Sequence, residues 1–402
     1  MSSPASPQTT FPISTRGTVL LHLNFLLTGI VMTFLGPMLP ILSARWNLND
    51  EQAGYLSFSQ FLSSMFGMLL SGMLVGRVGY RTTFIIGLVT MASGVTLLAS
   101  GPWLLGIVAV CIFGFGHGIT TPAGNLRTAE INPQRSASAL NVINAVWGIG
   151  AMSSPFLVAL AQRGHRPDLF LYGTAAALMV VLLPFLFVRF VPDVRTETRS
   201  PANMRDGWKA STLVLICALF FVYVGTETSF GVWIASYAKR LNSSSRSLWA
   251  MTPAFFWGAL LAGRLLAPFA LKFHRETTVA KLGLTLALAG GLVIVWARDM
   301  GSLIPGSILA GLGLASIFPI SVSLFPHWFG DSERNASSAV FASGNTGGAV
   351  LPWLVGTLST HTGSLRLALM VPLLGAASML VFYVTQGARR EGIPAVLSGP
   401  AK

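Results

Sequence analysis

The chain has 402 residues, of which 52% are hydrophobic and only 10% are charged, and its formal net charge is +13. A soluble domain usually carries about 25% charged residues, so this composition excludes an ordinary water-facing protein. The positive charge is explained by basic loops beside a membrane rather than by nucleic-acid binding. The two cysteines lie in apolar runs, so we expect neither a disulfide framework nor a bound metal or cofactor.

The predicted elements are almost all membrane-spanning helices. Residues 1–16 are polar and rich in Ser and Pro, and they are predicted to form a disordered tail. Hydrophobic runs then recur, each long enough for the roughly 20-residue helix that crosses a bilayer. We predict twelve such helices, at 17–43, 52–76, 83–101, 103–128, 137–162, 168–191, 211–238, 247–273, 278–297, 301–328, 335–361 and 365–387. The predicted fold class is an all-α membrane protein with two six-helix bundles.

The longest polar gap, residues 192–210, divides this series into two halves. We predict an N-terminal bundle at 17–191, a cytoplasmic linker at 192–210, a C-terminal bundle at 211–387 and a tail at 388–402. A glycine pair followed by a proline occurs once in each half at equal spacing: Gly114, Gly116 and Pro122, then Gly311, Gly313 and Pro319. Two similar apolar halves are typical of a transporter with its binding site between them.

Two other classes of membrane protein have the same overall hydropathy. A receptor or scaffold would bind without net flux, and a membrane enzyme would need a nucleophile–base or metal constellation, which the sequence lacks. We therefore expect no enzyme. Lys and Arg are more frequent in the loops on the side of the N-terminus, which predicts cytoplasmic N- and C-termini in the cell membrane. The expected partners are the lipid bilayer and a small solute, with no nucleic acid, and the expected state is a monomer.

One acidic side chain is out of place in this pattern. Glu227 lies well inside a hydrophobic run, where a carboxylate costs several kcal/mol unless it is paired, hydrated or protonated. It could accept hydrogen bonds from a substrate, couple transport to a proton or cation, or pair with a buried arginine. Arg264 is the matching cation, but counting the helical rise places it roughly 10 Å away in depth. We therefore expect Arg264 to be a structural residue that snorkels toward the interface.

Polar and aromatic side chains also share helix faces. His117, Thr121 and Asn125 recur every four residues, and Asn141, Asn144 and Trp147 recur every three. Amide groups give paired hydrogen bonds to hydroxyls, and an indole packs on the apolar face of a sugar ring. The same amides could instead hold helices together.

Residues 72–81 read Gly-Met-Leu-Val-Gly-Arg-Val-Gly-Tyr-Arg. This resembles the signature of the major facilitator superfamily, Gly-x-Leu-x-Asp-Arg-x-Gly-Arg-Arg/Lys, with Gly76 in place of the acid. The resemblance implies gating or structural roles for Gly72, Arg77 and Arg81. Because Gly76 replaces the acid, the usual charge relay at the cytoplasmic gate lacks its acidic member in this chain.

Further stretches resemble the fucose–galactose–glucose symporter family and the related sodium-coupled glucose carriers. They are Tyr223-Val224-Gly225-Thr226-Glu227, Phe230-Gly231-Val232-Trp233, Pro122-Ala123-Gly124-Asn125 and Ala139-Leu140-Asn141. The resemblance implies an alternating-access carrier for a hexose or related sugar. The acids of the proton symporters are replaced here by Gly36 and Thr121, so Glu227 is the remaining candidate for ion coupling.

These observations predict a secondary transporter of a sugar. Coupling to protons, coupling to sodium and uncoupled facilitation all remain open, as does an exporter of lipophilic molecules on the same fold. The predicted substrate-binding residues are Asn125, Asn141, Asn144, Trp147, Tyr223, Glu227, Trp233 and Asn345.

Overall fold

The computed structural model describes residues 15–187, 210–242, 247–323 and 333–391. Throughout these ranges the regular structure is α-helical, with no β-strand, which confirms the predicted all-α class. The predicted linker at 192–210, except Ala210, and most of the predicted tails at 1–16 and 388–402 lie outside the described residues.

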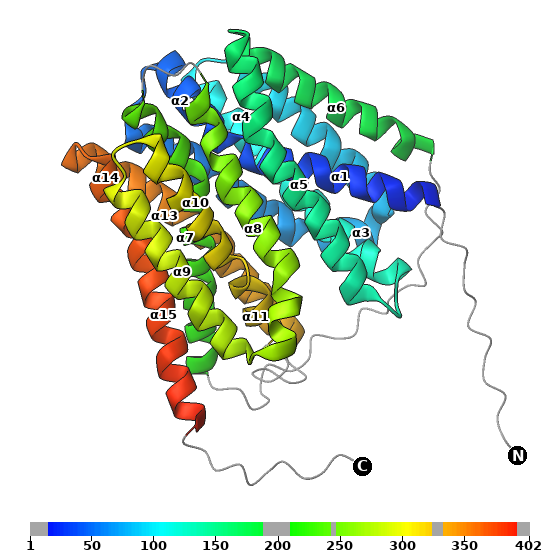
Figure 1. Cartoon of the computed structure of the whole chain (residues 1–402). Coiled ribbons are helices and arrows are strands. Elements are labelled where there is room, and N and C mark those ends of the chain that lie inside the picture. The colour runs from blue at the N-terminus through cyan, green and yellow to red at the C-terminus, as the bar shows by residue number, and fades with distance from the viewer. Residues whose placement is uncertain (1–14, 188–209, 243–246, 324–332, 392–402) are drawn as a thin grey trace, which may run out of the picture.

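Six helices form the first part of the chain (Figure 1): α1 Thr15–Thr33, α2 Leu35–Trp46, α3 Asp50–Ser100, α4 Trp103–Ile131, α5 Ser136–Arg163 and α6 Pro167–Phe187. Helices α1 and α2 meet at a bend of 42° and together fill the predicted span 17–43. Helix α3 begins with a capping box, in which the Asn49 side chain accepts from the Gln52 backbone and the Gln52 side chain accepts from Asn49.

The 51 residues of α3 would extend for roughly 75 Å as a straight helix, more than twice the thickness of a bilayer core. The helix instead breaks at Gly79, where φ is 78° and ψ is 168°. This left-handed region is open to glycine at little cost. The break separates the two predicted spans 52–76 and 83–101.

The second part of the chain is also helical. It comprises α7 Ala210–Leu241, α8 Leu248–Phe273, α9 Glu276–Trp296, α10 Met300–Leu314, α11 Ile317–Ser323, α13 Glu333–Thr362, α14 Leu365–Ala368 and α15 Met370–Glu391. In the described ranges, nine helices are long and apolar enough to cross a membrane, and the bent pair α1–α2 makes ten. Helix α13 is more polar than these, but it covers the predicted span 335–361.

We call α1–α6 the N-terminal half and α7–α15 the C-terminal half. Within the halves, α3 packs along α4 and α7 along α13; between them, α5 packs against α8, α3 against α13 and α2 against α7. The α2–α7 approach is very close, because a Cβ on Gly36 would lie 2.3 Å from the carbonyl oxygen of Gly231. Any side chain at residue 36 would therefore push the two halves apart.

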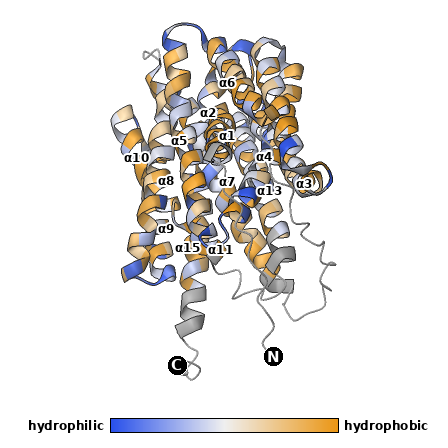
Figure 2. Cartoon of the chain, turned by 90° about the vertical axis from the view of Figure 1, so that its right-hand side faces the viewer, coloured by the Kyte–Doolittle hydropathy of each residue, from blue (hydrophilic) through white to orange (hydrophobic). Residues whose placement is uncertain are grey.

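Hydrophobic residues predominate along the helices (Figure 2), and many of their side chains are exposed on the outer surface. Leu104 and Phe187, for example, are 75% and 83% exposed. In water such a surface would cause aggregation, whereas in a bilayer it faces hydrocarbon at no cost. The polar side chains described below therefore stand out as groups that need partners inside the protein.

Candidate functional site between the two halves

Glu227 is held by two side chains of the C-terminal half. Arg264 Nη2 on α8 lies 3.2 Å from Glu227 Oε2 on α7 and 3.3 Å from the hydroxyl oxygen of Tyr223. The Tyr223 hydroxyl donates to the same carboxylate oxygen. The Glu227 and Arg264 side chains are 11% and 28% exposed, so the pair is largely shielded. We call these three residues the Glu227 cluster.

The cluster corrects the expectation for Arg264. Sequence reasoning placed its guanidinium at another depth from Glu227 and predicted that it would snorkel toward the interface, but the two side chains form an ion pair. Counting the rise per residue assumes straight helices perpendicular to the membrane. Helix tilt and the length of the arginine side chain together make up the difference in depth between the two residues.

The cluster is not saturated. Among the described residues, Glu227 Oε1 has no hydrogen-bond partner, and the buried Nε of Arg264 has none either. The ion pair offsets part of the cost of burying the carboxylate, while the free oxygen can still accept from a ligand hydroxyl. The charges of Glu227 and Arg264 neutralise each other, so the site has no net charge and suits a neutral polyol.

The predicted asparagines occupy different environments. Asn144 on α5 donates to Asn125 Oδ1 on α4 at 3.3 Å and to its own helix at Leu140 O at 2.8 Å. Asn141 and Asn144 are exposed, so their amides remain accessible. Asn345 on α13 donates to Phe341 O at 3.0 Å and approaches Met68 Sδ on α3 at 3.9 Å. The structure thus places two asparagines of the N-terminal half together, and a third at the α3–α13 contact.

His117 and Thr121, predicted to share a face with Asn125, form a separate buried chain. His117 Nε2 lies 3.2 Å from Thr121 Oγ1, and His117 Nδ1 lies 3.2 Å from Ser64 Oγ on α3. Both ring nitrogens are satisfied by hydroxyls within the N-terminal half. This arrangement is that of a structural histidine which joins α3 to α4.

The three predicted aromatic contacts also differ. The Trp147 ring of α5 meets the Trp257 ring of α8 edge to face, at a centroid distance of 6.1 Å and an angle of 82°. Tyr223 belongs to the Glu227 cluster. Trp233 is fully enclosed, and its Nε1 donates to Pro352 O on α13 at 2.8 Å. In this structure its ring and its donor are both occupied by protein, and a ligand contact by Trp233 stays a prediction.

A cavity lies where the halves meet. Its volume is about 20 Å³, and its walls come from α1, α2, α3, α7 and α8: Met32, Thr33, Gly36, Phe61, Thr228, Gly231, Val232 and Trp257. Sequence reasoning did not select Trp257. A signal was present, because Trp257 and Arg264 lie about two turns apart on one face of α8.

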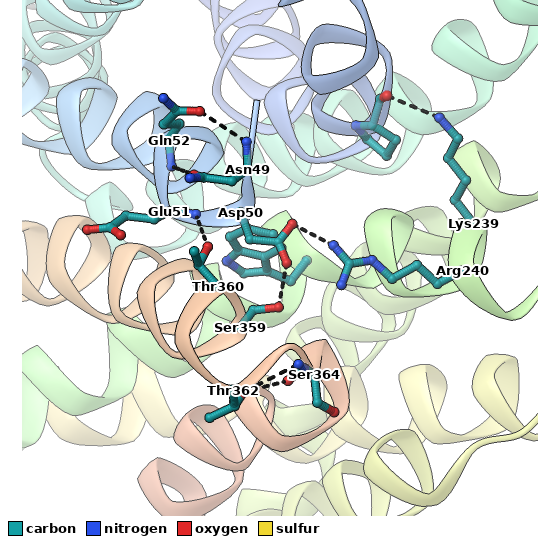
Figure 3. A network of polar contacts seen from close by, with 12 residues as sticks. Asn49, Asp50, Glu51, Gln52, Lys239, Arg240, Ser359, Thr360, Thr362 and Ser364 are labelled. Atoms are coloured by element: carbon teal, nitrogen blue, oxygen red, sulfur yellow. Dashed lines mark hydrogen bonds and ion pairs between the residues drawn. The ribbon is translucent and has the colours of Figure 1, made fainter. Parts of the chain in front are cut away.

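At one end of the molecule, polar contacts join the two halves (Figure 3). Asp50, at the start of α3, pairs with Arg240 of α7 at 2.5 Å and accepts from Ser359 of α13, and the Glu51 backbone donates to Thr360 Oγ1 at 2.9 Å. We call these five residues the Asp50 network. Nearby, Lys239 Nζ donates to the Pro40 carbonyl oxygen at 3.1 Å, also across the halves.

A further contact at this end joins α5 to the start of α8, where Arg163 Nε donates to Ser247 Oγ at 2.9 Å. Together with the Asp50 network and the Lys239–Pro40 contact, it brings residues from α2, α3 and α5 against α7, α13 and the start of α8. The halves are therefore closed against each other at this end.

The segment 72–81 makes no comparable contact. Arg77 is exposed and pairs with no acid in the described part of the chain, and a Cβ on Gly72 or Gly76 would meet nothing within 4 Å. Arg81 donates to Leu186 O at the end of α6, within its own half. The gating role predicted for Gly72, Arg77 and Arg81 stays a prediction.

Two helical halves around a shared cavity, with an apolar exterior and one closed end, define a membrane carrier. The sequence model of the Major Facilitator Superfamily matches residues 21–252 and 215–399, so the chain belongs to this superfamily. This membership confirms the predicted major facilitator fold and the expectation of a transporter rather than an enzyme.

Similar proteins cover nearly the whole chain. The glucose/galactose transporter of Brucella abortus biovar 1 (strain 9-941) is 25% identical over 389 residues, spanning 92% of this chain and 93% of that protein. The glucose/mannose transporter GlcP of Bacillus subtilis (strain 168) is 23% identical over 358 residues, spanning 85% and 88%. The crystal structure of nucleoside transporter NupG has a TM-score of 0.71 at 15% identity, covering 94% of this chain and 98% of that one.

Proposed function

We propose that this protein transports a hexose or a related sugar across the cell membrane by alternating access. The observation that carries the proposal is the Glu227 cluster, a shielded ion pair with a free carboxylate oxygen beside the cavity-lining helices α7 and α8. The glucose/galactose and glucose/mannose transporters among its relatives support this substrate class.

The chemistry of the site suits a neutral, hydroxyl-rich solute. Glu227 Oε1 accepts from a sugar hydroxyl, and the exposed amide of Asn141 donates and accepts. Asn144 Oδ1 accepts, since both N–H groups of Asn144 already have partners. The Trp147 ring offers an apolar surface to the C–H face of a pyranose. Arg264 holds the orientation of the carboxylate through the ion pair while the sugar binds.

Transport follows from opening the halves at alternate ends around this site. With cytoplasmic termini, the Asp50 network lies on the outer side, because α1 and α2 together carry the chain from Thr15 across to Trp46. The structure then corresponds to a carrier closed toward the outside. Inward release of the sugar takes place from such a state.

Proton, sodium or no coupling is decided by what happens at Glu227. Proton coupling requires the carboxylate to take up a proton and to weaken its pair with Arg264. Sodium coupling requires several oxygen ligands around the ion, and Glu227 Oε1 would be one of them. Uncoupled facilitation leaves the ion pair intact throughout the cycle.

The test is uptake of radiolabelled solutes into proteoliposomes with imposed proton or sodium gradients. We expect saturable hexose uptake and hexose counterflow, and thermal stabilisation of the purified protein by hexoses. Stabilisation and transport by hydrophobic cations, with no response to any hexose, would replace the sugar carrier with an exporter of lipophilic molecules. Hexose binding without flux would indicate a receptor.

A further inference from the structure

Trp257 combines two features that rarely coincide in a membrane interior. Its indole lines the cavity between the halves and is only 6% exposed, and its Nε1 has no hydrogen-bond partner. Buried donors in proteins are almost always paired, and the hydrocarbon region supplies no water to replace a missing partner. An unpaired donor on a ring that lines the cavity is therefore available to an acceptor on a ligand once the halves move apart.

The position of the Trp257 ring is fixed by its neighbours. A Cβ on Gly231 of α7 would lie 2.5 Å from the ring atom Cζ2, so glycine at 231 leaves the space that the indole fills. Phe256 packs edge to face at 5.3 Å, and Trp147 of the opposite half does so at 6.1 Å. The donor is thus held by both halves, and an opening between them would release one of its contacts.

Other tryptophans differ from Trp257 either in having a paired donor or in lying away from the cavity. Trp233 donates to Pro352 O, and Trp46 donates to Gly101 O at 3.1 Å. Trp353 also has a buried, unpaired Nε1, but it packs against Tyr55 and Phe58 and is not part of the cavity wall. Trp353 therefore serves as a natural control for Trp257.

The cavity is small in this structure. Its volume is about 20 Å³, room for about one water molecule, whereas pockets that enclose small molecules measure roughly 300–1,000 Å³. A sugar therefore binds in a state in which the two halves lie further apart at this site. The cavity also lies close to the Glu227 cluster, because Gly231 follows Glu227 by about one turn of α7.

We propose that Trp257 is a specificity-determining residue that donates its indole N–H to one oxygen of the transported sugar. The proposal rests on the proposed sugar transport and adds a residue and a contact to it. The sugar oxygen accepts the hydrogen bond that the protein leaves unmade, so a sugar lacking that oxygen leaves the donor buried and unpaired.

The test is a comparison of Trp257→Phe with Trp353→Phe against glucose and its 2-, 3-, 4- and 6-deoxy analogues. In the wild-type carrier, one deoxy position should weaken binding roughly 3- to 10-fold, the usual effect of one hydrogen bond. Trp257→Phe should weaken binding of glucose by a similar factor and should no longer discriminate against that one analogue. Trp353→Phe should keep the wild-type profile, because its donor lies outside the cavity.

Size-exclusion chromatography and thermal melting of the detergent-purified variants establish that both fold. If Trp257→Phe does not fold, Trp257→Tyr is the second variant, because it keeps a large ring and moves the donor. It should change the discrimination against that one deoxy analogue and against no other. Wild-type discrimination in both folded variants would overturn the assignment of Trp257. Absence of hexose transport by the wild-type protein would instead overturn the proposed function itself.

Discussion

The two ends of the molecule differ in the contacts between the halves. At one end, the Asp50 network and the Lys239–Pro40 contact cross from one half to the other. At the other end, the segment 72–81 carries the superfamily's gate signature, yet its exposed Arg77 pairs with no acid in the described ranges. Gly76 stands where the signature has an acid. The difference indicates that this chain relies on polar contacts at the Asp50 end to hold a closed state.

The strength of these contacts fits a gate that must reopen. The Arg240 and Asp50 side chains are 45% and 19% exposed, and an exposed ion pair contributes only about 0–1 kcal/mol. Several such contacts together can favour one state by a few kcal/mol without locking it. A single buried ion pair would be far harder to separate in each transport cycle.

The largest effect should come from making the closed end permanent. Asp50→Cys combined with Ser359→Cys places two thiols where the side chains now touch. After oxidation, hexose uptake in proteoliposomes should fall to background, and reduction with dithiothreitol should restore it. The oxidised wild-type protein, with its free Cys111 and Cys217, is the control. Full uptake despite a cross-link confirmed by mass spectrometry would show that this end does not open during transport.

The next largest effect should follow from Glu227→Gln, which acts at the site rather than at either end. It removes the charge-assisted hydrogen bonds with Tyr223 and Arg264 and changes the free Oε1. A hydrogen bond to a charged group contributes about 1.5–3 kcal/mol, so uptake should fall roughly 10- to 150-fold. The measurement is initial-rate uptake across pH, with and without sodium.

A matched control for this variant is Asp168→Asn, which removes a surface ion pair with Arg45 within the N-terminal half. It should leave uptake unchanged, and thermal melting should show that both variants fold. Equal rates for wild type and Glu227→Gln under all conditions would exclude Glu227 from both recognition and coupling.

A smaller effect should distinguish the two ends directly. Asp50→Asn weakens the contact with Arg240 and should shift the population toward outward opening by roughly 2- to 5-fold, the size expected for an exposed ion pair. Labelling of a cysteine introduced on the outer side of the cavity measures that shift. Asp168→Asn, at a pair that does not cross the halves, should label at the wild-type rate. Equal labelling in the two variants would remove Asp50 from the gate.

The smallest effect on transport should come from Trp233→Phe. Its indole donates to Pro352 O in a fully enclosed site, so the variant should lose about 0.5–1.5 kcal/mol of stability and show a lower melting temperature. Hexose affinity should change less than about 2-fold, since a single lost structural hydrogen bond leaves the cavity intact. A marked loss of affinity at unchanged melting temperature would return Trp233 to the binding site.

Much of the fold could be predicted from the sequence because its signals are local. Hydrophobic length predicted the helices, and Gly79 in the gate signature lies where α3 breaks. The sequence also predicted the burial of Glu227, because a carboxylate inside a membrane-spanning run is too costly to expose to lipid and faces the protein interior. The partners of these side chains could not be predicted in the same way. Residue spacing placed Arg264 away from Glu227, and it gave no reason to select Trp257, whose donor is unpaired beside the cavity.

The sequence alone determined the class of protein, its helical spans and the residues whose burial demands an explanation, since hydropathy and helical periodicity depend on neighbours along the chain. Only the tertiary structure decided which side chains meet. Arg264 reaches Glu227 because α7 and α8 lie together, and Asp50 reaches Arg240 because the two halves are closed at that end. Such contacts depend on helix tilt and on the state of the carrier, which residue spacing does not encode.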